Sequence, residues 1–203
     1  MTPPGPQLHI RTVEHVLRGL RRSPSGVQAA HTRTAAVYVL FSGIDTEPIV
    51  TLIRRAATLR QHQGEYAFPG GGVEAFDRSV HDAALREVKE ELGVGTGKIE
   101  PWGELEPELT VSSGFLVVPF TGRLDDSAKL TPAPEEVAEV VRVPLACFVD
   151  PVNGRTITRL AAAVRPSDEP EFRTIDAYAF EGRVIWGATA RIIGQVVTHL
   201  RAA

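Results

Sequence analysis

Three glutamates in one short segment are the residues of this chain best suited to chemistry. Glu90 and Glu91 follow Glu87 by three and four residues, and both intervals fall on one face of a helix. Carboxylates held so close together repel one another and raise each other's pKa values. Mg²⁺ and Mn²⁺ prefer hard oxygen ligands and would neutralise such a cluster. The spacing is therefore compatible with a site for divalent cations.

The same spacing also has a simpler interpretation. Glutamates on a helix commonly form a solvated face, and Arg86 stands four residues before Glu90, an interval at which the two side chains would pair. A glycine-rich loop upstream, Phe68-Pro69-Gly70-Gly71-Gly72, favours chemistry instead. Glycines permit positive φ angles and close approach of the backbone. We therefore expect this loop to pack against the acidic helix.

A helix over residues 79–92 is expected to position the acids. Ser79 to Asp82 fits a capping box at its start, and Gly93 stands where a glycine would end it. An apolar stripe runs beside the acidic one and consists of Ala84, Leu85, Val88 and Leu92. The helix would bury this stripe and keep the glutamates on the adjacent face.

The remaining periodic segments predict one α/β (α+β) domain over residues 1–203. An amphipathic helix is expected over 11–22, within an N-terminal helical arm of about 1–30, and a C-terminal helix over about 188–202. Apolar and β-branched segments predict strands at 34–41, 48–53, 99–109, 114–122, 137–143, 156–164 and 172–180. Strands mixed with few helices, without regular βαβ alternation, indicate a mixed sheet.

The composition excludes several classes of protein. The 203 residues carry 22 Lys and Arg against 25 Asp and Glu, without a basic block, so nothing drives nucleic-acid binding. Cys147 is the only cysteine, which excludes an intramolecular disulfide and fits a reducing compartment. The longest apolar run, residues 35–41, is seven long, against roughly 20 for a membrane span. We expect a cytoplasmic protein without nucleic-acid or membrane partners.

Three stretches resemble a known family. Residues 86–94 match the second half of the Nudix box, R-E-U-x-E-E-x-G-U, where U is apolar. Upstream, Arg60-x3-Gly64-x3-Phe68-Pro69-Gly70-Gly71 is similar to the additional motif of coenzyme A-type Nudix hydrolases. Residues 186–190, Trp-Gly-Ala-Thr-Ala, resemble the C-terminal sequence of that subfamily.

The resemblance implies a Nudix-type α/β/α sandwich with a mixed sheet and a diphosphatase activity. The implied substrate is coenzyme A or a derivative, split into 3′,5′-ADP and 4′-phosphopantetheine. Mg²⁺ or Mn²⁺ would be bound by Glu87 and Glu91, with Glu90 as a further ligand, while Arg86 would serve catalysis by orienting a glutamate. Asp77 would replace the outer acid of the box, although one extra residue separates it from Arg86.

Substrate contacts are also implied by the resemblance. Gly70 and Gly71 would let the backbone approach the substrate. Arg60 and Arg55, with Arg54 beside it, would supply positive charge for the additional 3′-phosphate of coenzyme A. For Arg54 and Arg55, an ordinary solvent-facing position at a strand edge is an equal alternative.

The general base and the exact substrate have alternatives. Glu135 and Glu136 are candidates for a base on a later loop, and a flexible acidic loop is the other interpretation. The partner is expected to be a small nucleoside diphosphate derivative; ADP-ribose and dinucleotides are alternatives to coenzyme A. A non-catalytic Nudix-fold regulator would be expected to have lost acids that are present here. The sequence leaves the oligomeric state undecided, with a homodimer as one option.

Overall fold

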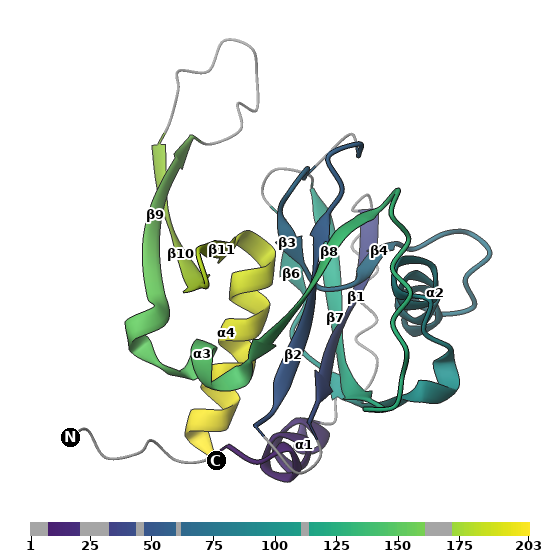
Figure 1. Ribbon diagram of the computed structural model, residues 1–203, viewed down its shortest axis with the longest axis horizontal. Coiled ribbons are helices and arrows are strands. Elements are labelled where there is room, and N and C mark those ends of the chain that lie inside the picture. Colours follow the sequence, from purple (N-terminus) through teal and green to yellow (C-terminus); the bar gives the residue numbers. More distant parts are fainter. Residues whose placement is uncertain (1–7, 21–32, 44–46, 60–61, 111–113, 161–171) are drawn as a thin grey trace.

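A mixed β-sheet forms the centre of the molecule (Figure 1). The computed structural model describes residues 8–20, 33–43, 47–59, 62–110, 114–160 and 172–203. The main sheet has the order β3-β2-β1-β7-β5, with β4 paired to β1, β6 to β7 and β8 to β2. Its strands are β1 (Arg33–Ser42), β2 (Ile49–Arg55), β3 (Tyr66–Ala67), β4 (Gly70–Gly72), β5 (Ile99–Glu104), β6 (Glu108–Leu109), β7 (Phe115–Leu124) and β8 (Val137–Pro144).

The pairing of these strands confirms the predicted mixed sheet. β1 and β7 run parallel over nine residue pairs, from Arg33↔Phe115 to Phe41↔Arg123. β1 pairs with β2 and β4 in the antiparallel sense, and so do β2 with β8 and β5 with β7. A second, antiparallel sheet has the order β11-β10-β9 and is built from β9 (Gly154–Leu160), β10 (Phe172–Phe180) and β11 (Arg183–Trp186).

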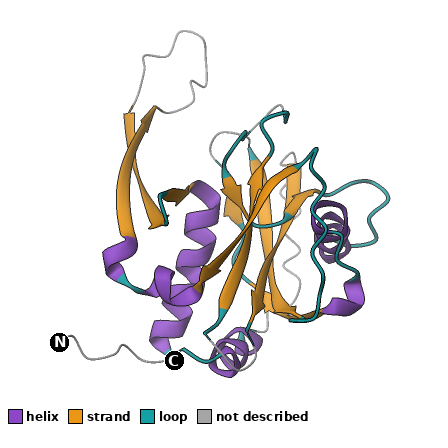
Figure 2. Cartoon of the chain, in the orientation of Figure 1, coloured by secondary structure: helices purple, strands orange, loops and turns teal. Residues whose placement is uncertain are grey.

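Helices cover both faces of the main sheet (Figure 2). They are α1 (Ile10–Gly19), α2 (Val80–Leu92), α3 (Leu145–Val149) and α4 (Gly187–Ala202), with short 3₁₀ turns at η1 (Thr96–Lys98) and η2 (Pro151–Asn153). Side chains of β1 alternate between the faces: Tyr38 packs with α2, whereas Val39 packs with α1, α3 and α4. Both are fully buried. The result is the expected sandwich of helix, sheet and helix layers.

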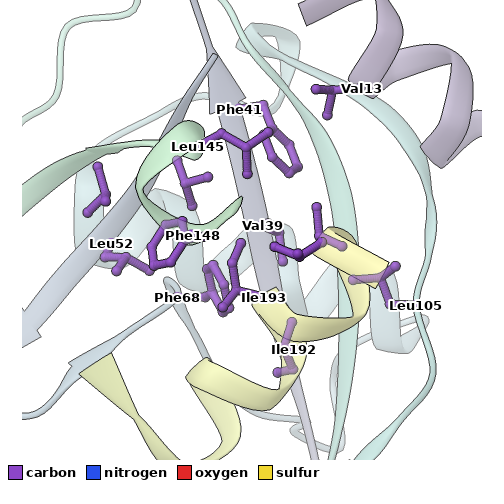
Figure 3. Packing of buried hydrophobic residues seen from close by; sticks show 14 of the residues in the cluster. Val13, Val39, Phe41, Leu52, Phe68, Leu105, Leu145, Phe148, Ile192 and Ile193 are labelled. Atoms are coloured by element: carbon purple, nitrogen blue, oxygen red, sulfur yellow. The ribbon is translucent and has the colours of Figure 1, made fainter. Parts of the chain in front are cut away.

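The larger of the two cores lies between the sheet and helices α1, α3 and α4 (Figure 3). Ile192 and Ile193 of α4 pack there with Phe68, which precedes β4. Burying apolar side chains such as these contributes about 1.5–3 kcal/mol each to stability. The C-terminal helix is therefore part of the support of the glycine-rich segment.

Several expected elements need correction at their ends. The strand expected over 99–109 is divided into β5 and β6, and the glycine-rich segment contributes β3 and β4, which its sequence did not predict. α3 and β11 were also not predicted. Residues 1–7 and 21–30 of the expected N-terminal arm, which include the end of the first expected helix, lie outside the described residues, and so do residues 161–164. No helix among the residues described is long and apolar enough to cross a membrane.

Candidate metal-binding active site

Helix α2 presents the acidic residues to the glycine-rich segment. The hydroxyl of Ser79 accepts a hydrogen bond from the Asp82 amide (3.0 Å) at its start, and Gly93 ends it in the left-handed conformation (φ 67°). Both caps were predicted. The buried stripe differs by one position, because Ala83 is fully buried whereas Leu85 is only partly so. Packing of this stripe on the sheet turns Glu87 and Glu91 toward β4.

Three carboxylates converge beside the first two glycines of β4. Single carboxylate oxygens of Glu87, Glu91 and Glu136 lie within 4.8 Å of one another. Glu91 is only 2% exposed, and the side chain of Glu87 is 13% exposed. Glu136 comes from the loop before β8. Glu136 is a predicted candidate for the general base, and the structure places it in one cluster with two predicted metal ligands.

The glycines allow the helix and the sheet to approach closely. The Gly70 amide donates a hydrogen bond to Glu91 Oε2 (2.8 Å). A Cβ on Gly70 would lie 2.3 Å from the Ala36 carbonyl oxygen, and one on Gly71 would lie 2.4 Å from Glu87 Oε1. Backbone atoms leave no room for a side chain at Gly70, and a side chain at Gly71 would displace the Glu87 carboxylate. Gly70 and Gly71 thus lie against the carboxylates, as the proposed close approach of the loop requires.

The environment of the cluster disfavours three free negative charges. Burial raises the pKa of Glu91 to about 8, aided by the charges of Glu87 and Glu136 and opposed by the Gly70 hydrogen bond. Burial also raises the pKa of Glu87, while Arg86 opposes the shift. A divalent cation would relieve this repulsion, and the donor set consists entirely of the hard oxygens that Mg²⁺ and Mn²⁺ prefer. The residues present fit such an ion.

Arg86 orders the outer side of the site. Its Nε and one terminal nitrogen donate to the two oxygens of Asp77 (3.0 and 3.1 Å), and that nitrogen also donates to the Gly72 carbonyl (3.0 Å). The other terminal nitrogen donates to Glu87 (2.9 Å) and Glu90 (2.8 Å). Hydrogen bonds to these carboxylates raise the pKa of Arg86 and lower that of Asp77. Since these bonds use all five guanidinium donors, Arg86 positions glutamates and has none left for substrate.

Glu90 occupies a different environment from the three clustered acids. Its carboxylate pairs with Arg86, and its side chain is 52% exposed. This is the pairing that the simpler interpretation of the helix anticipated for Glu90. A metal-binding role for this residue stays a prediction.

Backbone hydrogen bonds hold the loop that carries Glu136 both to the end of α2 and to Ala56, the residue after β2. The Thr131 and Ala133 amides donate to the Leu92 and Glu91 carbonyls (2.8 and 3.0 Å) and so cap the end of α2. On the other side, the Ala56 amide donates to the Glu136 carbonyl (2.9 Å). Glu135, the second base candidate, accepts a hydrogen bond from Thr58 through its backbone carbonyl (3.1 Å) and does not belong to the carboxylate cluster described above.

Arg55 supplies positive charge beside the cluster, and the charge of its guanidinium acts to lower the pKa of Glu91. Its Nε atom is buried without a hydrogen-bond partner among the residues described. A buried donor without a hydrogen-bond partner lowers the stability of the protein. This atom is therefore available to donate a hydrogen bond to an oxygen of a ligand. Arg60, the other predicted substrate-binding arginine, lies outside the described residues.

Comparisons with known proteins agree with this arrangement. A family model described as the NUDIX domain matches residues 31–160. The chain is 35% identical over 157 residues to "Uncharacterized Nudix hydrolase NudL" of Photorhabdus laumondii, covering 76% of this chain and 79% of that protein. The protein of the same name from Yersinia enterocolitica is 36% identical over 181 residues, covering 89% and 88% respectively.

Among solved structures, a MutT/nudix family protein from Enterococcus faecalis matches with a TM-score of 0.54 at 19% identity. The match covers 90% of this chain and 66% of that one. At this identity the likeness concerns the fold alone. It extends beyond the residues that the family model matches, to most of the chain.

Proposed function

The chain belongs to the Nudix family of hydrolases, which act on diphosphate bonds, and from this premise we propose that its substrate is coenzyme A or a derivative. The products would be 3′,5′-ADP and 4′-phosphopantetheine. The cluster of Glu87, Glu91 and Glu136 against Gly70 and Gly71 is the observation that carries the proposed metal-dependent cleavage of a diphosphate. The similarity of residues 60–71 to the coenzyme A-type motif supports the choice of substrate.

Glu87, Glu91 and Glu136 would hold Mg²⁺ or Mn²⁺. When bound, such an ion offsets the charge of the diphosphate oxygens while water attacks phosphorus. The protein's own contribution is orientation: the Gly70 amide holds the Glu91 carboxylate, and Arg86 holds that of Glu87. Glu136 would bind the ion, and either Glu136 or Glu135 would accept the proton of the attacking water.

Recognition of the substrate would depend on positive charge near the carboxylates. We propose that the unpaired Nε of Arg55 donates to a phosphate oxygen, as a charge-assisted hydrogen bond. Arg60 is proposed to contact the 3′-phosphate, on the strength of its spacing to Gly64 alone. A cytoplasmic location and a homodimer stay predictions.

Two other functions are alternatives to this proposal. The carboxylate cluster would equally suit a Nudix hydrolase of ADP-ribose or of a dinucleotide, because these share the diphosphate. A non-catalytic regulator is disfavoured by the presence of Glu87 and Glu91 in a buried cluster, since carboxylates buried so close together repel one another and are costly to keep without a role.

The proposal is tested by incubating the protein and Mg²⁺ with coenzyme A, dephospho-coenzyme A, ADP-ribose and a dinucleotide, and identifying products by mass. We expect coenzyme A to be cleaved with the highest kcat/KM. Charged hydrogen bonds contribute about 1.5–3 kcal/mol, so dephospho-coenzyme A should be poorer by about tenfold or more.

The same panel identifies the arginine responsible and the outcomes that reject the proposal. If the Arg60 guanidinium contacts the 3′-phosphate, Arg60→Ala should bring the kcat/KM values for coenzyme A and dephospho-coenzyme A closer together. A ratio of these two kcat/KM values near one in the wild type would reject recognition of that phosphate. Cleavage of ADP-ribose without cleavage of either coenzyme A compound would reject the substrate assignment and retain the family.

A further inference from the structure

A buried hydroxyl links the C-terminal helix to the edge of the main sheet. Thr189, in the first turn of α4, is 9% exposed, and its Oγ1 donates a hydrogen bond to the Tyr66 carbonyl (3.1 Å). Tyr66 belongs to β3, the short outer strand beside β2. Thr189 lies within Trp-Gly-Ala-Thr-Ala, residues 186–190, a segment to which the proposed function assigns no role.

Two further contacts hold the same corner of the molecule. Phe68, two residues after Tyr66, is buried in one cluster with Ile192 and Ile193 of α4 (Figure 3). β11, which leads directly into α4, lies beside β3. There Arg183 donates to Glu139 of β8 (2.6 Å). The C-terminal segment therefore holds β3 and the residue after it by a hydrogen bond and by apolar packing on Phe68. Its ion pair is with β8, which like β3 pairs with β2.

The chain from Tyr66 leads directly to the carboxylates. Pro69 accepts a hydrogen bond from the Tyr38 amide (2.8 Å), and the next residue, Gly70, donates its amide to Glu91. Only three residues, 67–69, separate the carbonyl held by Thr189 from that amide. A shift of β3 would be transmitted to Gly70 because Phe68 and Pro69, which lie between them, are both buried, and buried side chains are closely packed.

We propose that Thr189 is a positioning residue for the active site. By holding the Tyr66 carbonyl it fixes β3, and through β3 it keeps the Gly70 amide directed at Glu91. This assigns a role to the C-terminal motif, residues 186–190: it supports the glycine-rich segment. The inference rests on the proposed function insofar as Glu91 is a metal ligand.

The test compares Thr189→Val, which has a similar shape and lacks the hydroxyl, with Thr189→Ser, which retains it. Mn²⁺ affinity is measured by titration without substrate, and amide hydrogen exchange is followed over residues 66–72. We expect Thr189→Val to weaken Mn²⁺ binding about fivefold, as for the loss of one hydrogen bond of about 1 kcal/mol. Exchange over residues 66–72 should accelerate, and Thr189→Ser should stay within about twofold of wild type.

Thr198→Val is a matched control in the same helix. Its hydroxyl donates to the Gly194 carbonyl within α4 and is exposed, so we expect neither Mn²⁺ affinity nor exchange over residues 66–72 to change. Should Thr189→Val fail to fold, Thr189→Ala replaces it in the same comparison.

Unchanged Mn²⁺ affinity and unchanged exchange in a folded Thr189→Val protein would overturn the inference, even if its thermal stability fell. Failure of the wild type to bind Mn²⁺ would instead contradict the proposed metal site. The exchange measurement would then still decide whether Thr189 holds the glycine-rich segment.

Discussion

At the scale of single residues, Gly71 shows how the absence of a side chain shapes the site. Its backbone is ordinary, but a Cβ there would meet Glu87 Oε1 at 2.4 Å. Gly71→Ala should fold, because the obstructed atoms are the end of a flexible side chain that can move aside. Moving that carboxylate should weaken Mn²⁺ binding by about tenfold, the order of loss seen when groups supporting a metal site are disturbed.

Gly72→Ala provides the matched control for this prediction. It is the next residue of the same strand, and an added Cβ would meet nothing within 4 Å. We expect its Mn²⁺ titration to follow that of the wild type. Equal losses of Mn²⁺ affinity in the two variants would contradict this prediction. They would show that any substitution in β4 weakens binding, whether or not it contacts Glu87.

The sequence predicted the individual residues of the site unevenly. Glu87 and Glu91 follow from helical spacing, because that spacing fixes which side chains share a face. Glu90 shares the same spacing, yet Arg86 holds it on the exposed side. Glu136 could be named only as a base, since its approach to the other acids depends on hydrogen bonds to Leu92, Glu91 and Ala56 that no local pattern encodes.

At the scale of elements, the helices and long strands were predicted where their sequence signals are strong. α2 has a serine cap, an apolar stripe and a terminal glycine, and its bounds agree with those expected. β3 and β4 were not predicted, because strand prediction depends on side-chain alternation and three of their five residues are glycines. Their strand pairing comes from contacts with β2 and β1 that are distant in the sequence.

At the scale of the whole molecule, the carboxylate cluster should reduce stability when no metal is bound. Burial raises the pKa of Glu91 from an ordinary value near 4.5 to about 8. The folded state therefore retains the proton that the unfolded state loses, and the metal-free protein should lose stability as pH rises between about 4.5 and about 8. By linkage, a shift of that size corresponds to a loss of at most about 5 kcal/mol.

Denaturant unfolding of the metal-free protein at pH 5 and pH 8 measures this effect. Glu91→Gln should have a flatter pH dependence and be more stable than wild type at pH 8, because a neutral amide replaces the buried charge. The neighbouring Glu90→Gln, at an exposed position, should keep the wild-type dependence. Saturating Mg²⁺ should reverse the order of wild type and Glu91→Gln. If the unfolding free energies of metal-free wild type and Glu91→Gln changed in parallel with pH, this explanation would be refuted.

The most direct test of the account is the Mn²⁺ affinity of Glu136→Gln compared with that of Glu90→Gln, measured by titration without substrate. The structure groups Glu136, and not Glu90, with Glu87 and Glu91. We therefore predict that Glu136→Gln weakens Mn²⁺ binding by at least about tenfold and Glu90→Gln by less than about threefold. Wild-type affinity in Glu136→Gln, together with a large loss in Glu90→Gln, would contradict the proposed metal centre.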